Sequence, residues 1–203
     1  HTFNTGIDVA LFGNRLLLSA NYYNSRTTDM LYLYNVSVPP FTYNTLLANI
    51  GSMRNWGTEI AIGITPLKIK DMELNINANI TFQRNKLLSL SGMYNGEMLS
   101  APEYKSLASL DGAGFHGGYN HIVYQMVGQP LGVFYLPHST GLESDGNGEY
   151  TYGVADLNGG GVSLEDGEDR YVAGQAVPKT ILGSNISFRY KRFDLSLQVN
   201  GAF

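Results

Sequence analysis

The feature that most constrains the fold of this chain is residues 72–83, MELNINANITFQ, in which apolar and polar residues alternate without interruption. A period of two is typical of a β-strand, because successive side chains point to opposite faces. The polar face consists of Glu73, Asn75, Asn77, Asn79, Thr81 and Gln83. Surface strands of soluble domains more often carry Lys and Glu. This largely neutral face therefore predicts an enclosed environment, in which amides and hydroxyls meet water or other protein groups.

The same alternation recurs along the chain, and no segment has a convincing helical period. The sequence therefore predicts an all-β fold of antiparallel strands. The expected strands span residues 4–12, 15–24, 48–65, 72–86, 180–190 and 193–203.

The connections between these strands alternate between short and long. Short turns are expected at residues 13–14, 66–71 and 191–192, and long loops at about 25–47 and 89–177. Transmembrane β-barrels have this arrangement, with short periplasmic turns and long extracellular loops. Loop length thus favours a barrel in an outer membrane over a sandwich.

Strand length supports the same prediction. Twelve alternating residues at about 3.3 Å each reach about 40 Å, and a tilt of about 40° leaves roughly 30 Å along the membrane normal. We expect the apolar face to meet lipid and the Asn-rich face to meet a wet or plugged lumen. Six strands are too few to close, since the smallest such barrels have about eight. Residues 1–203 are therefore expected to be a segment of one larger barrel domain.

Composition excludes several classes of protein. The net charge of −4 argues against nucleic-acid binding, which requires basic surfaces. Cysteine is absent, which excludes disulfides and thiolate metal sites. Charged residues make up only 15% of the chain, against roughly 25% in an average soluble domain.

Four motifs in order resemble the SusC/RagA-type TonB-dependent outer-membrane transporters. They are NIGSMRNWGTEI at 49–60, GQPLGVFY at 128–135, ADLNGGGVSLEDGEDR at 155–170 and PKTILGSNISFRYKRFDLS at 178–196. The residues of the first motif that match are Asn49, Gly51, Met53, Asn55, Gly57 and Glu59. Those of the last are Pro178, Lys179, Gly183, Phe188, Tyr190, Phe193, Asp194 and Leu195. Thr58 and Leu136 depart from the residues usual at their positions.

The resemblance implies a 22-stranded barrel closed by an N-terminal plug, energised by the TonB complex and lodged in the outer membrane. It further implies a SusD-like surface lipoprotein partner, uptake of glycans or peptides, and no enzymatic activity. The plug domain and the TonB box are not in this sequence. The alternative hypothesis is a secreted all-β carbohydrate-binding module with a β-sandwich fold.

Residues 156–167 suggest a calcium loop, since Asp156 and Asn158 occupy positions one and three of an EF-hand-like pattern. Position five is Gly160 and position twelve is Gly167, and neither supplies a side-chain oxygen. The alternative is a turn rich in Asp, Asn and Gly, which favour turns for backbone reasons.

Three further groups of residues have both a functional and a structural interpretation. Gly57, Ala61 and Gly63 lie on the expected lumen face, where small residues leave room for a plug or relieve strand curvature. The GxGxxG pattern at 112–117 lacks the strand and helix that a dinucleotide site needs. Loop aromatics suited to stacking on sugars, contacting a partner or holding their own loops together are Phe41, Tyr43, Phe115, Tyr119, Tyr150 and Tyr152.

Overall fold

A computed structural model describes residues 1–109, 121–144 and 146–203 of the chain. These residues form β-strands, turns and irregular connections. Within them, no helix is long and apolar enough to cross a membrane. The GxGxxG pattern, Phe115 and Tyr119 lie outside the described residues.

The chain divides into two compact units. The sheet unit comprises residues 1–28, 52–85 and 178–203, and the loop unit comprises residues 29–51 and 86–177. Three strands, β2 (Leu16–Asn35), β3 (Thr45–Ile69) and β4 (Met72–Ser89), begin in one unit and end in the other.

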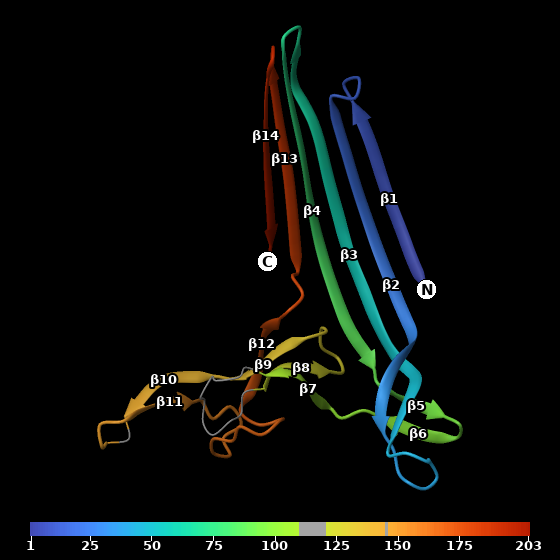
Figure 1. Ribbon diagram of the computed structural model, residues 1–203, viewed down its shortest axis with the longest axis vertical. Helices are drawn as coiled ribbons and strands as arrows, with labels where there is room; N and C mark the ends of the chain where they lie inside the picture. Colours follow the sequence, from blue (N-terminus) through green and yellow to red (C-terminus); the bar gives the residue numbers. More distant parts are fainter. Residues whose placement is uncertain (110–120, 145) are drawn as a thin grey trace. The chain divides into compact units, whose positions relative to one another are not determined.

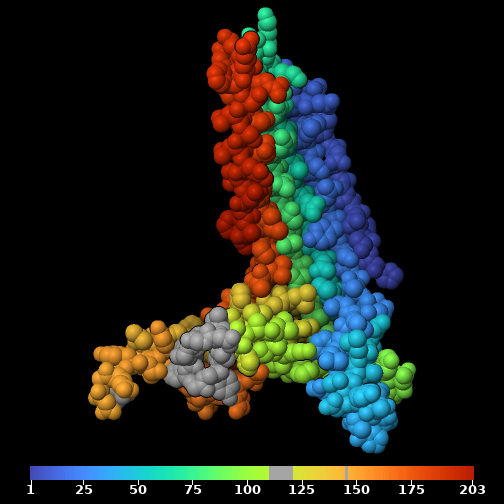
Figure 2. All heavy atoms as spheres, in the orientation of Figure 1, coloured from blue at the N-terminus to red at the C-terminus, as the bar shows by residue number. Residues whose placement is uncertain are grey.

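The sheet unit is a single six-stranded sheet with the order β1-β2-β3-β4-β13-β14. Its other strands are β1 (Thr2–Leu11), β13 (Thr180–Tyr190) and β14 (Phe193–Ala202). The three short turns, β1–β2, β3–β4 and β13–β14, lie at the same end of this sheet (Figure 1). In the space-filling view the strands form one continuous surface (Figure 2).

Strand pairing keeps polar residues on one face and apolar residues on the other. Ile76 of β4 pairs with Ile186 of β13, which pairs with Leu197 of β14. One position along, the corresponding row is Asn77, Asn185 and Gln198. Because directly paired residues share a face of the sheet, the alternation predicted for single strands extends across the sheet. We call the Asn-rich face the inner face and the apolar face the outer face.

Strands β1 to β4 are longer than the sequence predicted, whereas β13 has the predicted bounds and β14 ends one residue earlier. The expected turn at 66–71 shrinks to Lys70 and Asp71, because β3 continues to Ile69. Strand β2 was expected to end at 24 but runs to Asn35, and β3 begins at Thr45. The expected loop 25–47 is therefore wrong over most of its length. The missed part of β2 contains two Thr and two Tyr, and both residue types favour strands.

The expected long loop at 89–177 is also wrong in part, because its described residues contain eight short strands. They form a hairpin of β5 (Ser91–Tyr94) and β6 (Glu97–Ser100), and another of β10 (Ser139–Ser144) and β11 (Tyr150–Val154). The remaining four make a sheet with the order β12-β9-β8-β7. Their bounds are Arg170–Gln175, Val133–Pro137, His121–Met126 and Tyr104–Ser109.

The buried apolar residues of the described chain all lie in the loop unit. One cluster contains Tyr34, Ala48 and Leu99, and a second contains Tyr124, Val133 and Tyr135. The loop unit therefore has cores of its own, whereas the sheet unit exposes apolar residues on its outer face.

Candidate functional site

The inner face of the sheet unit forms a hollow of about 580 Å³. Its polar lining comes from five of the six strands. The lining side chains that can form hydrogen bonds are Asp8, Ser19, Asn77, Asn79, Asn185, Gln198 and Asn200. All but Asp8 are neutral, so the hollow suits a partner that hydrogen-bonds without requiring a matched charge.

Small residues open the centre of this hollow. Ala61 and Gly63 line it from β3, and Gly183 lines it from β13. A Cβ atom added at Gly63 would lie 3.1 Å from Asn77 Oδ1 and 3.6 Å from Leu17 Cβ. Both neighbours belong to the same inner face, so a side chain at Gly63 would project into the hollow.

Position 57 requires a glycine for a different reason. A Cβ atom there would lie 2.7 Å from the Tyr23 hydroxyl oxygen and 2.4 Å from the Phe82 carbonyl oxygen. Such contacts are too short for any real Cβ, and the second one is with backbone. The space beside Gly57 is therefore filled by Tyr23 of the neighbouring strand, and it is not open to a plug. The room-for-a-plug interpretation stays a prediction for Ala61 and Gly63 only.

Three charged residues of the inner face lie together at its turn end. Glu73 pairs with Arg189, which pairs with Asp194 across β4, β13 and β14. Arg189 Nε lies 2.8 Å from Asp194 Oδ1. Asn75 donates to Glu73 at 3.0 Å and accepts a hydrogen bond from Thr65 at 2.7 Å. These residues thus satisfy one another and leave the hollow itself nearly uncharged.

The loop that suggested calcium is held by its own hydrogen bonds. The Asp156 carboxylate accepts from the backbone N–H groups of Gly159 at 2.6 Å and Gly161 at 3.0 Å. Asn158 accepts from Gly160 N–H at 2.8 Å and donates to Glu168. Among the described residues, no group of three or more His, Asp or Glu side chains is arranged to hold a metal ion. The calcium site at Asp156 and Asn158 stays a prediction.

Asp169 organises this loop, and the sequence alone did not single it out. Its side chain is fully buried. Its two carboxylate oxygens accept from Leu157 N–H at 2.6 Å and from Ser163 N–H at 2.8 Å. The Ser163 hydrogen bond first, and the Leu157 bond second, lower the pKa of Asp169 below its ordinary value. No local periodicity marks such a residue, because its partners lie 6 and 12 positions away.

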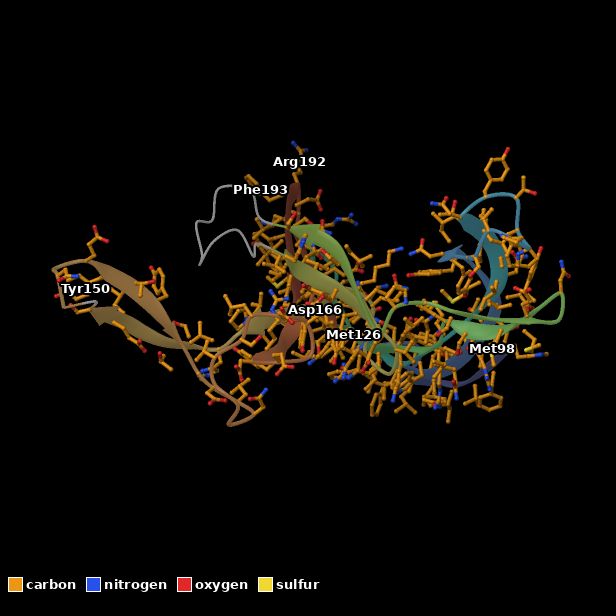
Figure 3. The ribbon with its side chains drawn as sticks, turned by 90° about the horizontal axis from the view of Figure 1, so that it is seen from below. Met98, Met126, Tyr150, Asp166, Arg192 and Phe193 are labelled. Carbon is orange, nitrogen blue, oxygen red and sulfur yellow. The ribbon has the colours of Figure 1, made fainter. Side chains whose placement is uncertain are left out.

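The next residue, Arg170, fixes the loop to the four-stranded sheet. Its buried guanidinium donates to the Tyr124 hydroxyl and to Asp166 Oδ1 at 3.1 Å. Its Cζ atom lies 5.3 Å and 5.7 Å from the ring centroids of Tyr124 and Tyr135. Burial raises the pKa of the Tyr124 hydroxyl, which keeps it protonated at neutral pH. Asp166 lies in the loop that Arg170 holds (Figure 3).

The loop aromatics divide into buried and exposed residues. Phe41 packs against the Tyr34, Ala48 and Leu99 cluster and is thus a structural residue. Tyr43, Tyr150 and Tyr152 are 75%, 70% and 52% exposed. Tyr150 lies at the tip of the β10–β11 hairpin (Figure 3). Exposed aromatic rings of this size offer large contact areas.

The sequence and fold match one family of proteins. Residues 1–201 match the family model described as TonB dependent receptor-like, beta-barrel. This chain belongs to that family. The sheet unit is therefore a segment of the wall of an integral outer-membrane β-barrel, whose outer face meets lipid, and the alternative hypothesis of a secreted β-sandwich is wrong.

Curated relatives and solved structures agree with this family. The chain is 32% identical over 201 residues to the TonB-dependent receptor P3 of Formosa agariphila, covering 95% of this chain and 19% of the relative. It is 24% identical over 202 residues to the TonB-dependent receptor SusC of Bacteroides thetaiotaomicron, covering 99% of this chain and 19% of SusC. The RagAB peptide importer in its open-open state matches with a TM-score of 0.69 at 20% identity, over 99% of this chain and 20% of that chain.

The chain thus spans about a fifth of the length of the relatives that it matches. The likeness to RagAB is a likeness of fold.

Proposed function

We propose that this chain is part of a TonB-dependent outer-membrane importer that takes up oligosaccharides or peptides. The observation that carries the proposal is the nearly uncharged, hydrogen-bonding hollow of the inner face, within a family of outer-membrane receptors. In a barrel wall such a face borders the interior. Neutral amides fit polar, uncharged cargo or a plug that must move, because they bind without the cost of separating buried ion pairs.

The proposal includes two partners. A SusD-like lipoprotein covers the extracellular end and captures cargo, and the TonB complex supplies energy through a plug. Support comes from the similarity to SusC and from the exposed aromatic residues Tyr43, Tyr150 and Tyr152 in the loop unit. Aromatic side chains provide large contact areas both for sugar faces and for protein partners.

No covalent chemistry on the cargo is part of this proposal. The inner face offers amides and hydroxyls, and its charged residues at the turn end are paired with one another. The protein's task is then selection and passage, with the direction set by the energy that TonB delivers.

The test is an uptake assay with adjacent variants of one strand. Asn185 lines the hollow, and the adjacent Ile186 lies in an outer-face row between Ile76 and Leu197. We expect Asn185→Trp in the full-length protein to reduce uptake of labelled oligosaccharides or peptides by about tenfold or more, because the bulky ring projects into the passage. Ile186→Trp should leave uptake unchanged, since its side chain meets lipid.

Uptake must also stop when TonB is removed. Transport of a siderophore or a cobalamin-like ligand alone, with no uptake of oligosaccharides or peptides, would overturn the cargo class while leaving the barrel in place. Uptake that survives both TonB removal and Asn185→Trp would overturn the importer proposal itself.

Calcium at residues 156–167 is a secondary proposal. Binding would require Asp156 to exchange two backbone hydrogen bonds for metal contacts. Calorimetric titration of Ca²⁺ into the full-length protein and into its Asp156→Ala variant tests this, with heat lost in the variant as the supporting result. No binding heat in either protein would contradict it.

A further inference from the structure

Acidic residues of the sheet unit's strands are confined to the inner face. The four acidic residues of its strands, Asp8, Glu59, Glu73 and Asp194, all occupy inner-face positions. Three arginines, Arg26, Arg54 and Arg84, occupy outer-face positions near the end of the strands opposite the short turns. All three are exposed. The outer face at this end is therefore cationic, with no acidic side chain from the strands of the sheet unit.

Arg54 is positioned by its neighbours on the outer face. Its Nε donates to Asn24 Oδ1 at 2.9 Å, and its guanidinium lies 4.9 Å from the centroid of the Trp56 ring. These contacts use one N–H group and one face of the guanidinium. The remaining N–H groups are free to bind an anion from outside, since the guanidinium carries five donors.

Arg26 lies beside Arg54 on the neighbouring strand β2. Two contacts fix the register of β2 and β3: Thr65 N–H donates to the Arg15 carbonyl, and Gly57 lies beside Tyr23. Continuing the same register along both strands places Arg54 directly opposite Arg26.

Arg84 is placed by the equivalent argument on β4. Thr65 donates to Asn75, and Gly63 lies beside Asn77. These two contacts fix the register of β3 and β4, and continuing that register places Trp56 opposite Arg84. The three arginines therefore surround Trp56 on three neighbouring strands.

Such a cluster is unfavourable by itself. Like charges directly opposite each other on adjacent strands destabilise a sheet. An anion from outside the sheet unit relieves this repulsion. Arginine suits phosphate in particular, because its planar donor fork binds two phosphate oxygens at once.

The surroundings of the cluster identify the source of the anion. The adjoining outer-face residues include the aromatic side chains Phe3, Tyr22 and Phe82, and beyond them the outer face is apolar. Basic and aromatic residues beside an apolar band mark the level of lipid headgroups. We propose that Arg26, Arg54 and Arg84 bind the phosphate of an anionic lipid headgroup. This inference rests on the outer-membrane location of the barrel and is independent of the cargo.

Native mass spectrometry of the full-length protein in detergent tests the proposal. The probes are dioleoyl phosphatidic acid, which has a phosphate headgroup, and dioleoyl phosphatidylcholine, which is zwitterionic. We expect the wild-type protein to retain phosphatidic acid preferentially. The triple variant Arg26→Gln, Arg54→Gln, Arg84→Gln should lose about fivefold in affinity per arginine, on the order of a hundredfold in total.

A matched control removes the same charge from the opposite end. The variant Lys70→Gln, Lys191→Gln, Arg192→Gln alters only residues of the short turns. It should retain phosphatidic acid as the wild type does. Equal losses in both triple variants, or no loss in the arginine variant, would overturn the proposal.

Two further measurements keep the result interpretable. Displacement of phosphatidic acid by millimolar inorganic phosphate would indicate a free-anion site and overturn the assignment to lipid. If the triple variant fails to give a folded barrel by circular dichroism, Arg54→Gln replaces it, with about a fivefold loss expected. The arginine variants can still be assayed for cargo uptake. Failure of the lipid-binding proposal therefore does not imply failure of the importer proposal.

Discussion

The two units of this chain differ in whether their apolar side chains are buried within the protein. In the loop unit, tyrosines and leucines close over small cores, and Tyr34, Leu87, Tyr124 and Val133 are almost completely buried. In the sheet unit, Ile7, Ile60 and Leu197 remain exposed on the outer face. A soluble protein would hide these residues against a second layer. The sheet unit instead leaves its apolar face to lipid, so its stability depends on the membrane, while the loop unit depends on its own packing.

This comparison is tested most strongly by placing a charge on the outer face. Ile186 lies between Ile76 and Leu197 in the middle of the apolar rows. We expect Ile186→Arg to lower the free energy of unfolding of the full barrel by about 2–4 kcal/mol, because arginine is costly at the bilayer midplane. The measurement is the unfolding free energy of the barrel in lipid vesicles.

The neighbouring residue provides the control. Asn185 lies on the inner face, so Asn185→Arg should change the unfolding free energy by less than about 1 kcal/mol. Equal destabilisation by the two substitutions would mean that the faces of the sheet unit have been assigned wrongly.

A smaller effect is expected where two strands touch most closely. Adding a methyl group at Gly57 drives it against the Phe82 backbone, which cannot move aside as a side chain can. Gly57→Ala should therefore destabilise the barrel by about 1–3 kcal/mol. Gly63→Ala meets the Asn77 side chain at 3.1 Å and Leu17 Cβ at an ordinary 3.6 Å, so it should cost much less. Chemical denaturation of both variants in vesicles measures the difference, and identical values would refute the close-packing explanation.

The same contrast explains what the sequence could predict. Alternation identified all six strands of the sheet unit, their faces and their three turns, because a membrane and a polar interior impose opposite demands on successive residues. It missed the continuation of β2 to Asn35. Asp29 adopts a φ of 59° within that strand, and such a local irregularity interrupts the alternating pattern.

The loop unit was harder to predict because its strands are short and irregular. The pairing of β7 with β8 shifts register near Ala108, and that of β12 with β9 shifts near Gly174. Bulges of this kind break the period of two. Its central contact joins Arg170 to Tyr124, which are 46 positions apart. The sequence therefore located the loop that contains Asp156 and Asn158 but not the residues, Asp169 and Arg170, that hold it.

The smallest effect is expected for the acid stability of the loop that Asp169 holds. Hydrogen bonds from Ser163 and Leu157 lower the pKa of Asp169 below its ordinary value of 3.8. A lowered pKa contributes stability that is present above 3.8 and is lost as the pH falls through the folded-state pKa. We expect the loop around residues 157–163 to keep its hydrogen-exchange protection at pH 5 and to lose it progressively below about pH 4.

Asp169→Asn separates this effect from general acid unfolding. The amide keeps the shape of the side chain but replaces one acceptor oxygen by a donor, so one of the two backbone N–H groups loses its partner. Protection of residues 157–163 at neutral pH should fall by about tenfold, and the remaining protection should no longer depend on pH between 3 and 5. The six-stranded sheet should keep its protection in both proteins, because its stability comes from strand pairing and lipid contact. An acid transition that persists unchanged in Asp169→Asn would show that Asp169 is not its origin.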